Sequence, residues 1–213
     1  MMGWITPIVL SLQLNVVCLA AQNIEIVFDF KTPPEPAVES IMESEIRQIL
    51  EPAQLNLEFR RLAETDSLET FTKIILVRFQ GTCHAGWSID PVQLNQPGLL
   101  DLPALGRTEV SGGRVMPFVH IFCNEVRAFV PTVSRISQEQ MYGRALGRVV
   151  VHELYHALLS TLEHTHGGIA RSVQSARDLT RDKVALDAVS IARLREMWGR
   201  KEEEASDQLP ADR

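Results

Sequence analysis

Four of the six histidines in this 213-residue chain lie between positions 152 and 166. His152 and His156 are four residues apart, so on an α-helix their rings project from one face about one turn apart. That separation suits two nitrogen ligands of a single zinc ion. Glu153 projects beside the same face, where a carboxylate could act first as general base and then as general acid in a hydrolysis. The pattern therefore predicts two ligands and one proton-transfer group.

A hydrolytic zinc site usually has three protein ligands and one open position, so a third ligand must come from elsewhere in the chain. His164 and His166 are the nearest candidates, because Gly167 and Gly168 follow them and allow the chain to turn back. In an extended chain these two histidines are about 7 Å apart, so we expect only one of them to bind.

The helix that carries the motif is the longest helical pattern in the chain. Ser137 begins it, with Gln140 completing a capping-box spacing, and it continues past Leu158. Gly143 and Gly147, four apart on this helix, predict close approach of a neighbouring strand or helix.

Earlier segments predict a strand, a helix and two further strands. Residues 24–30 and 55–60 alternate in polarity, and residues 73–79 form an apolar run typical of a central strand. Between them, residues 37–50 carry apolar side chains at spacings of three and four. We therefore expect a small α+β fold in which a mixed sheet packs on the motif helix.

Residues 81–113 are rich in Gly, Pro, Asp and Asn, and we interpret them as a long irregular segment. Residues 115–123 return to strand character, and Pro117, which lacks an N–H donor, favours an edge strand there. A peptide could lie antiparallel along residues 118–123. A last amphipathic helix is expected from about 179 to 198, followed by a flexible tail at 205–213.

The N-terminal residues 1–21 are largely apolar and end in small residues, which is typical of a signal peptide. Export to the periplasm or the medium would place the remaining domain, residues 22–204, in an oxidising compartment. Cleavage would leave Cys83 and Cys123 as the only thiols, and this even number suggests one disulfide. Two buried free cysteines are the alternative.

Composition excludes several classes of protein. Apolar residues make up 45% of the chain and charged residues 23%, as in ordinary globular proteins. With 21 basic and 27 acidic residues the net charge is −6 and no basic block stands out, so we expect no nucleic-acid binding. No apolar run after the N-terminal segment is long enough to span a bilayer.

At the motif residues the sequence resembles the zincin metallopeptidases. It differs from the metzincin pattern, which places a Gly and a third His where this chain has Leu159 and Leu162. It is more similar to a group of exported bacterial predicted metallopeptidases in which a longer gap leads to His-Ser-x-x-Gly-Ile-Met-Arg. Here that segment reads HTHGGIAR, with Ala170 in the place of Met.

This resemblance implies that His164 is the third zinc ligand, that His166 is a variable position, and that the fold is zincin-like. Some zincins have an acidic third ligand, which leaves Asp182 as a reserve candidate. The resulting prediction is a zinc-dependent endopeptidase-like hydrolase that acts on peptides or proteins, with His152, His156 and His164 as ligands and Glu153 as the catalytic residue. Two alternatives remain open. One is an exported metal-binding structural protein without activity, and the other is a zinc hydrolase of a non-peptide amide or ester.

Overall fold

The computed structural model describes residues 23–64, 71–86, 104–131 and 134–207. The predicted signal segment and residues 208–213 of the predicted tail lie outside these ranges. In chain order the elements are β1 (Asn23–Phe30), α1 (Pro36–Leu50), β2 (Asn56–Arg61), β3 (Lys73–Gln80), β4 (Gly106–Ser111), β5 (Arg114–Phe122), α2 (Cys123–Ala128), α3 (Arg135–Leu159), α4 (Ala176–Thr180) and α5 (Ala188–Asp207).

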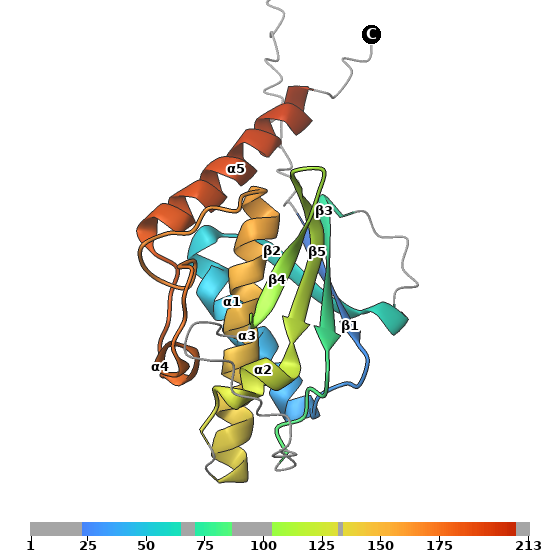
Figure 1. Ribbon diagram of the computed structural model, residues 1–213. Helices are drawn as coiled ribbons and strands as arrows, with labels where there is room; N and C mark the ends of the chain where they lie inside the picture. The colour runs from blue at the N-terminus through green and yellow to red at the C-terminus, as the bar shows by residue number, and fades with distance from the viewer. Residues whose placement is uncertain (1–22, 65–70, 87–103, 132–133, 208–213) are drawn as a thin grey trace, which may run out of the picture.

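The five strands form one mixed sheet in the order β2-β1-β3-β5-β4. Strands β1, β2, β3 and β5 run parallel, and β4 runs antiparallel to β5 at one edge. Helices α1 and α3 pack against each other beside the sheet (Figure 1). This is the predicted α+β arrangement of a small mixed sheet on the motif helix.

The hydrophobic core lies between the sheet and these two helices. Alternate strand residues fill it from one side, because successive side chains of a strand point to opposite faces. The helices fill it from the other side at spacings of three and four. Its fully buried members include Ile24, Ile26 and Phe28 of β1, Ile75, Val77 and Phe79 of β3, Val38, Met42 and Ile46 of α1, and Leu146, Val150 and Leu154 of α3.

Two glycines let α3 approach α1 closely, as predicted. A Cβ atom at Gly143 would lie 2.9 Å from the Val38 carbonyl oxygen, and one at Gly147 would lie 2.9 Å from the Met42 carbonyl oxygen. Any side chain at these positions would therefore push the two helices apart.

The structure corrects the interpretation of residues 81–113 and of the following strand. Residues 106–111 form the edge strand β4, and β5 is internal because it pairs with both β3 and β4. Pro117 is tolerated in β5 for two reasons. Pairing with β3 begins only at Phe118, and the β4 ladder is irregular opposite Pro117, between the pairs at Val115 and Val119.

The helix boundaries also differ from the prediction. Helix α3 begins at Arg135, after Ser134, and no side-chain capping bond is made there, so the capping box predicted at Ser137 does not form. The predicted helix from 179 to 198 is divided into α4 and α5, because the chain leaves the helical conformation at Arg181 and resumes it at Ala188.

The predicted disulfide is present. Cys83, just after β3, is bonded to Cys123 at the start of α2, and their Cα atoms lie 5.0 Å apart. Both residues are buried. Within the described part of the chain, no helix has the length and apolar character needed to cross a membrane.

Candidate metal centre

Helix α3 carries two histidines of the motif on one face, and the chain then turns to bring up a third. The helix ends at Leu159, and Ser160 follows in the left-handed conformation with φ of 49°. The loop beyond it places His164 against His152 and His156. We call these three residues the histidine cluster.

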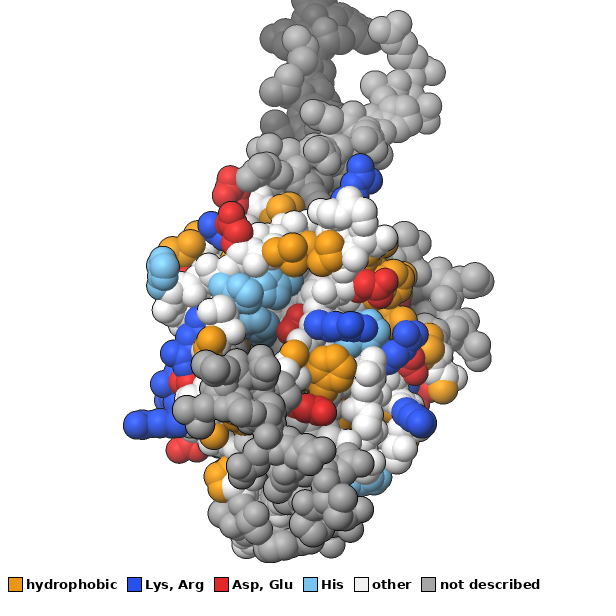
Figure 2. Space-filling view, viewed as in Figure 1, with side chains coloured by type: hydrophobic (Ala, Val, Ile, Leu, Met, Phe, Trp, Pro, Cys, Tyr) orange, Lys and Arg blue, Asp and Glu red, His pale blue; other side chains and the backbone are white. Residues whose placement is uncertain are grey.

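The three imidazoles of the histidine cluster bring one nitrogen each into the same small region. These three atoms all lie within 4.8 Å of one another, and the ring centroids are 4.7 to 5.2 Å apart. In the space-filling view, the largest group of histidine side chains lies left of centre on the face shown, and other histidines lie apart from it (Figure 2). His164 is exposed, and the other two rings are largely buried.

Main-chain carbonyl groups set the tautomers of the two helical histidines. His152 Nδ1–H donates to the Ile169 carbonyl oxygen at 2.9 Å, and His156 Nδ1–H donates to that of Thr161 at 2.8 Å. A carbonyl oxygen can only accept, so the proton of each neutral ring is on Nδ1. Both Nε2 atoms therefore present lone pairs, and these atoms face each other at 3.3 Å.

Two facing lone pairs repel each other unless a cation lies between them. Nitrogen ligands at about 2.0–2.1 Å from a tetrahedral zinc ion would be about 3.3–3.4 Å apart, which agrees with the observed separation. Burial lowers the pKa of His152 to about 4, opposed by its bond to Ile169, and burial also lowers the pKa of His156. Both rings are thus neutral near pH 7, as metal ligands must be. The residues present fit a divalent metal ion.

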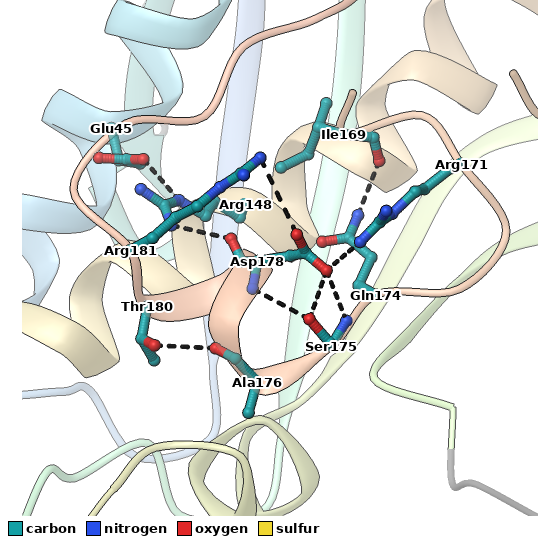
Figure 3. Close-up of polar contacts among 10 residues, drawn as sticks. All are labelled: Glu45, Arg148, Ile169, Arg171, Gln174, Ser175, Ala176, Asp178, Thr180 and Arg181. Atoms are coloured by element: carbon teal, nitrogen blue, oxygen red, sulfur yellow. Dashed lines mark hydrogen bonds and ion pairs between the residues drawn. The ribbon is translucent and has the colours of Figure 1, made fainter. Parts of the chain in front are cut away.

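The Ile169 carbonyl oxygen that orients His152 is itself held in place. It also accepts from Gln174 Nε2 at 2.7 Å. Just beyond, Asp178 receives hydrogen bonds from Arg171 and Ser175, and Arg148 donates to the main-chain oxygen of Asp178 at 2.9 Å (Figure 3).

Arg148 anchors this segment to the body of the protein. It lies on α3 four residues before His152, has no exposed surface, and pairs with Glu45 of α1 at 2.7 Å. Removing one partner of a buried charge pair of this kind strongly destabilises the folded protein. The loop behind His152 is therefore fixed to both helices.

Glu153 lies beside the histidine cluster with only 5% of its surface exposed. Its Oε2 accepts a hydrogen bond from Thr108 Oγ1 of β4 at 2.8 Å. Burial raises the pKa of Glu153 to about 7, although the bond from Thr108 acts to lower it. A carboxyl group with such a pKa can take up and release a proton near neutral pH.

Strand β4 reaches Glu153 because Gly106 allows close approach. A Cβ atom at this position would lie 3.0 Å from Glu153 Oε1 and 3.0 Å from Val149 Cγ1. The contribution of Thr108 and Gly106 was missed because their segment was interpreted as irregular. The Gly112-Gly113 pair was the signal in the sequence that could have indicated β4. It lies between two short runs of residues, and such pairs form two-residue hairpin turns. Both glycines have positive φ, 56° and 77°.

A cleft of about 410 Å³ opens over the histidine cluster and Glu153. Residues 104–108, leading into and forming the start of β4, line one side, and Leu162 and residues 172–174 also line it. Leu162 and Val173 are 57% and 64% exposed, so the cleft has an apolar rim.

The remaining candidate residues lie away from this centre. His166 is exposed and does not belong to the histidine cluster. The Asp182 carboxylate is 91% exposed and pairs with Arg144 at 2.9 Å, so it does not take the place of a ligand.

Known proteins resemble this chain in structure but do not match it in sequence. No family model matches the sequence, and no curated protein sequence matches it. The structure is similar to the crystal structure of archaemetzincin from Methanopyrus kandleri, with a TM-score of 0.50 and 10% sequence identity. The match covers 84% of this chain and 98% of that chain. At this identity the likeness shows the fold, which is zincin-like.

Proposed function

We propose that the chain is a zinc-dependent hydrolase that cleaves peptide bonds, with His152, His156 and His164 as ligands and Glu153 as the catalytic residue. One observation carries the proposal. Two imidazole lone pairs face each other at 3.3 Å, a third imidazole lies beside them, and a buried carboxyl group adjoins the same cleft. This combination supplies both a metal site and a proton-transfer group.

The chemistry divides between the ion and the chain. Zinc held by three imidazoles acts as a Lewis acid that acidifies water and polarises a carbonyl group. Thr108 holds Oε2 of Glu153, which leaves Oε1 to take a proton from water and then deliver it to the leaving amine. The pKa of about 7 suits both transfers, because the carboxyl group can exist in either form at neutral pH.

A peptide substrate would lie along β4. Phe122 N–H donates to the Leu105 carbonyl oxygen at 2.9 Å, and the next bonded pair is Arg107 with His120. In an antiparallel ladder the residues in between turn their N–H and C=O groups the other way. Gly106 and Thr108 therefore present main-chain groups at the free edge beside the cleft, where an extended peptide can pair with them.

Zinc analysis and peptide cleavage by single variants test the proposal. Glu153→Gln should keep zinc but lose at least about 100-fold in kcat, the low end of what a general base contributes. His156→Ala should lose zinc and activity together, whereas His166→Ala should keep both. Zinc content is measured by elemental analysis after dialysis, and cleavage by mass spectrometry of a mixed peptide library.

Three other results would contradict the proposal. A protein without zinc affinity has no metal centre. A zinc-loaded protein that cleaves no peptide, with Glu153→Gln indistinguishable from it, would point to a structural metal site. Cleavage of amide or ester model compounds, but of no peptide, would point to a hydrolase with another substrate.

We also infer that the chain is exported. The apolar N-terminal segment is typical of a signal peptide. The buried bond between Cys83 and Cys123 supports the inference, because such disulfides persist in oxidising compartments. N-terminal sequencing of protein recovered from the periplasm or medium tests it, and cleavage near residue 21 is expected.

A further inference from the structure

His164 differs from the other two histidines of the cluster in how its ring is held. His152 and His156 each donate Nδ1–H to a main-chain carbonyl group. Among the described residues, by contrast, no hydrogen bond to the ring of His164 is found, and this side chain is exposed. The main chain that carries His164 must therefore fix its position.

That main chain is a tight turn. Thr165 N–H donates to the Ala170 carbonyl oxygen at 3.0 Å, which closes the turn directly after His164. Ile169 N–H donates to the Ala185 carbonyl oxygen at 3.3 Å, which ties the turn to the segment before α5. Gly168 has φ of +66°, and a Cβ atom there would lie 2.8 Å from the Asp187 nitrogen. The turn thus packs directly against residues 185–187.

The carboxylate of Asp187 accepts a hydrogen bond from a side chain of this turn. Its Oδ1 accepts from the N–H groups of Val189 and Ser190 at 2.9 and 3.0 Å, so it caps the first turn of α5. Its Oδ2 accepts from Ser190 Oγ and from Thr165 Oγ1, both at 2.8 Å. One carboxylate therefore joins the start of α5 to the residue next to His164.

We propose that Asp187 is a positioning residue for the metal centre, which holds His164 in place through Thr165. The inference rests on the metal site of the proposed function but not on peptide cleavage. Thr165 has a single hydroxyl proton, and Gly167 O at 2.9 Å is its other acceptor. The charged carboxylate is the stronger acceptor, so the hydroxyl group directs its proton to Asp187.

Zinc affinity of the purified chain tests the proposal, measured by competition with a chromophoric chelator. Thr165→Val keeps the shape of the side chain and removes only the hydroxyl donor. Asp187→Ser keeps a helix-capping oxygen but shortens the side chain, so that Thr165 loses its acceptor. Each variant is expected to bind zinc about 10–100-fold more weakly, the usual effect of losing a residue that holds a ligand in place.

Two matched controls carry the same substitutions elsewhere. Thr180→Val removes a hydroxyl that bonds to the Ala176 carbonyl oxygen within α4, and Asp182→Ser removes the exposed partner of Arg144. Both should bind zinc within about twofold of the wild type. The absorption spectrum of the cobalt-substituted protein should change in Thr165→Val and Asp187→Ser but not in the controls, because it reports ligand geometry.

The outcomes separate this inference from the proposed function. A wild-type chain that binds no zinc removes both. If the wild type binds zinc and both test variants match it in affinity and cobalt spectrum, the positioning role is wrong while the metal centre stands. If a variant loses metal-free thermal stability but keeps its zinc affinity, Asp187 serves only the fold and the inference is overturned.

Discussion

Glu153 and His152 are neighbours on α3, and burial shifts their pKa values in opposite directions. The pKa of Glu153 rises to about 7, and that of His152 falls to about 4. Both shifts have the same cause, because burial disfavours the charged form of each group. Near pH 7 the metal-free protein therefore holds a neutral imidazole beside a carboxyl group that is partly protonated.

Without metal, the difference in stability between Glu153→Gln and the wild type should depend on pH. Between pH 4.5 and 7 the folded wild type keeps a proton on Glu153 that the unfolded chain releases. The stabilisation that comes from burying this carboxyl group in its neutral form is therefore lost as the pH rises through about 7. From pH 4.5 to pH 8, the free energy of unfolding of the variant should therefore rise by up to about 3 kcal/mol relative to that of the wild type.

Urea unfolding in the presence of a chelator, at pH 4.5, 6 and 8, measures this difference. The contribution of His152, which is lost as the pH falls from 6.5 toward 4, is common to both proteins and cancels. A difference in unfolding free energy that stays constant over the three pH values would show that Glu153 does not carry the raised pKa.

If the proposed function is right, Thr108→Val should shift the pH profile of peptide cleavage by the zinc-loaded protein. The Thr108 hydroxyl lowers the pKa of Glu153, so losing it raises this pKa further. The acid limb of kcat/KM should move to higher pH by about 0.5–1 unit. The control is Thr180→Val, which should leave the profile in place, and an unmoved acid limb in Thr108→Val would argue against the assigned contact.

The residue spacing predicted the helical part of the site but not the groups around it. Positions 152, 153 and 156 share a helix face whatever the rest of the fold does. The contacts of Thr108 and of the Ile169 carbonyl group arise from tertiary packing, which leaves no local pattern in the sequence. His164 was expected from the family resemblance, and the structure places it beside the other two rings.

At the scale of elements, β4 decides the shape of the site, and it was the strand that prediction missed. Its residues do not alternate in polarity, because it lies at the edge with most side chains exposed. The predicted strands, in contrast, carry apolar side chains that fill the core, which makes their pattern visible. An edge strand beside a cleft does not need apolar side chains at alternate positions.

Gly106→Ala should impair the proposed catalytic site. The new methyl group would lie 3.0 Å from Glu153 Oε1 and Val149 Cγ1, so these two side chains must give way by a few tenths of an ångström. We expect a loss of about 1–3 kcal/mol in unfolding free energy and a larger proportional loss of peptide cleavage. The matched control is Gly86→Ala, since nothing lies within 4 Å of a Cβ atom there. Equal behaviour of both variants would contradict the close approach of β4.

At the scale of the molecule, the fold class was predictable and the strand order was not. Apolar periodicity indicated one helix and four strands before the motif, and these are α1, β1, β2, β3 and β5. No pattern in the sequence indicated that β1 lies between β2 and β3 or that β5 is internal. Such order depends on which faces can be covered together, and this is a property of the whole chain.

Zinc should raise the thermal stability of the whole protein, because the histidine cluster joins α3 to the loop beyond it. At free zinc near 100 times Kd the gain is about 2.7 kcal/mol, which corresponds to about 5–10 °C in Tm. Differential scanning calorimetry with zinc and with a chelator measures it. His156→Ala should show no such rise, and an equal rise in that variant would place the stabilising metal elsewhere.

The bond between Cys83 and Cys123 has a topological consequence. It closes a covalent ring that contains residues 84–122, and β4 and β5 belong to this ring. A single backbone cut within the ring opens the ring without releasing a fragment. The nicked molecule would migrate as one species on a non-reducing gel and as two after reduction, with the cleft wall still attached until a thiol is added.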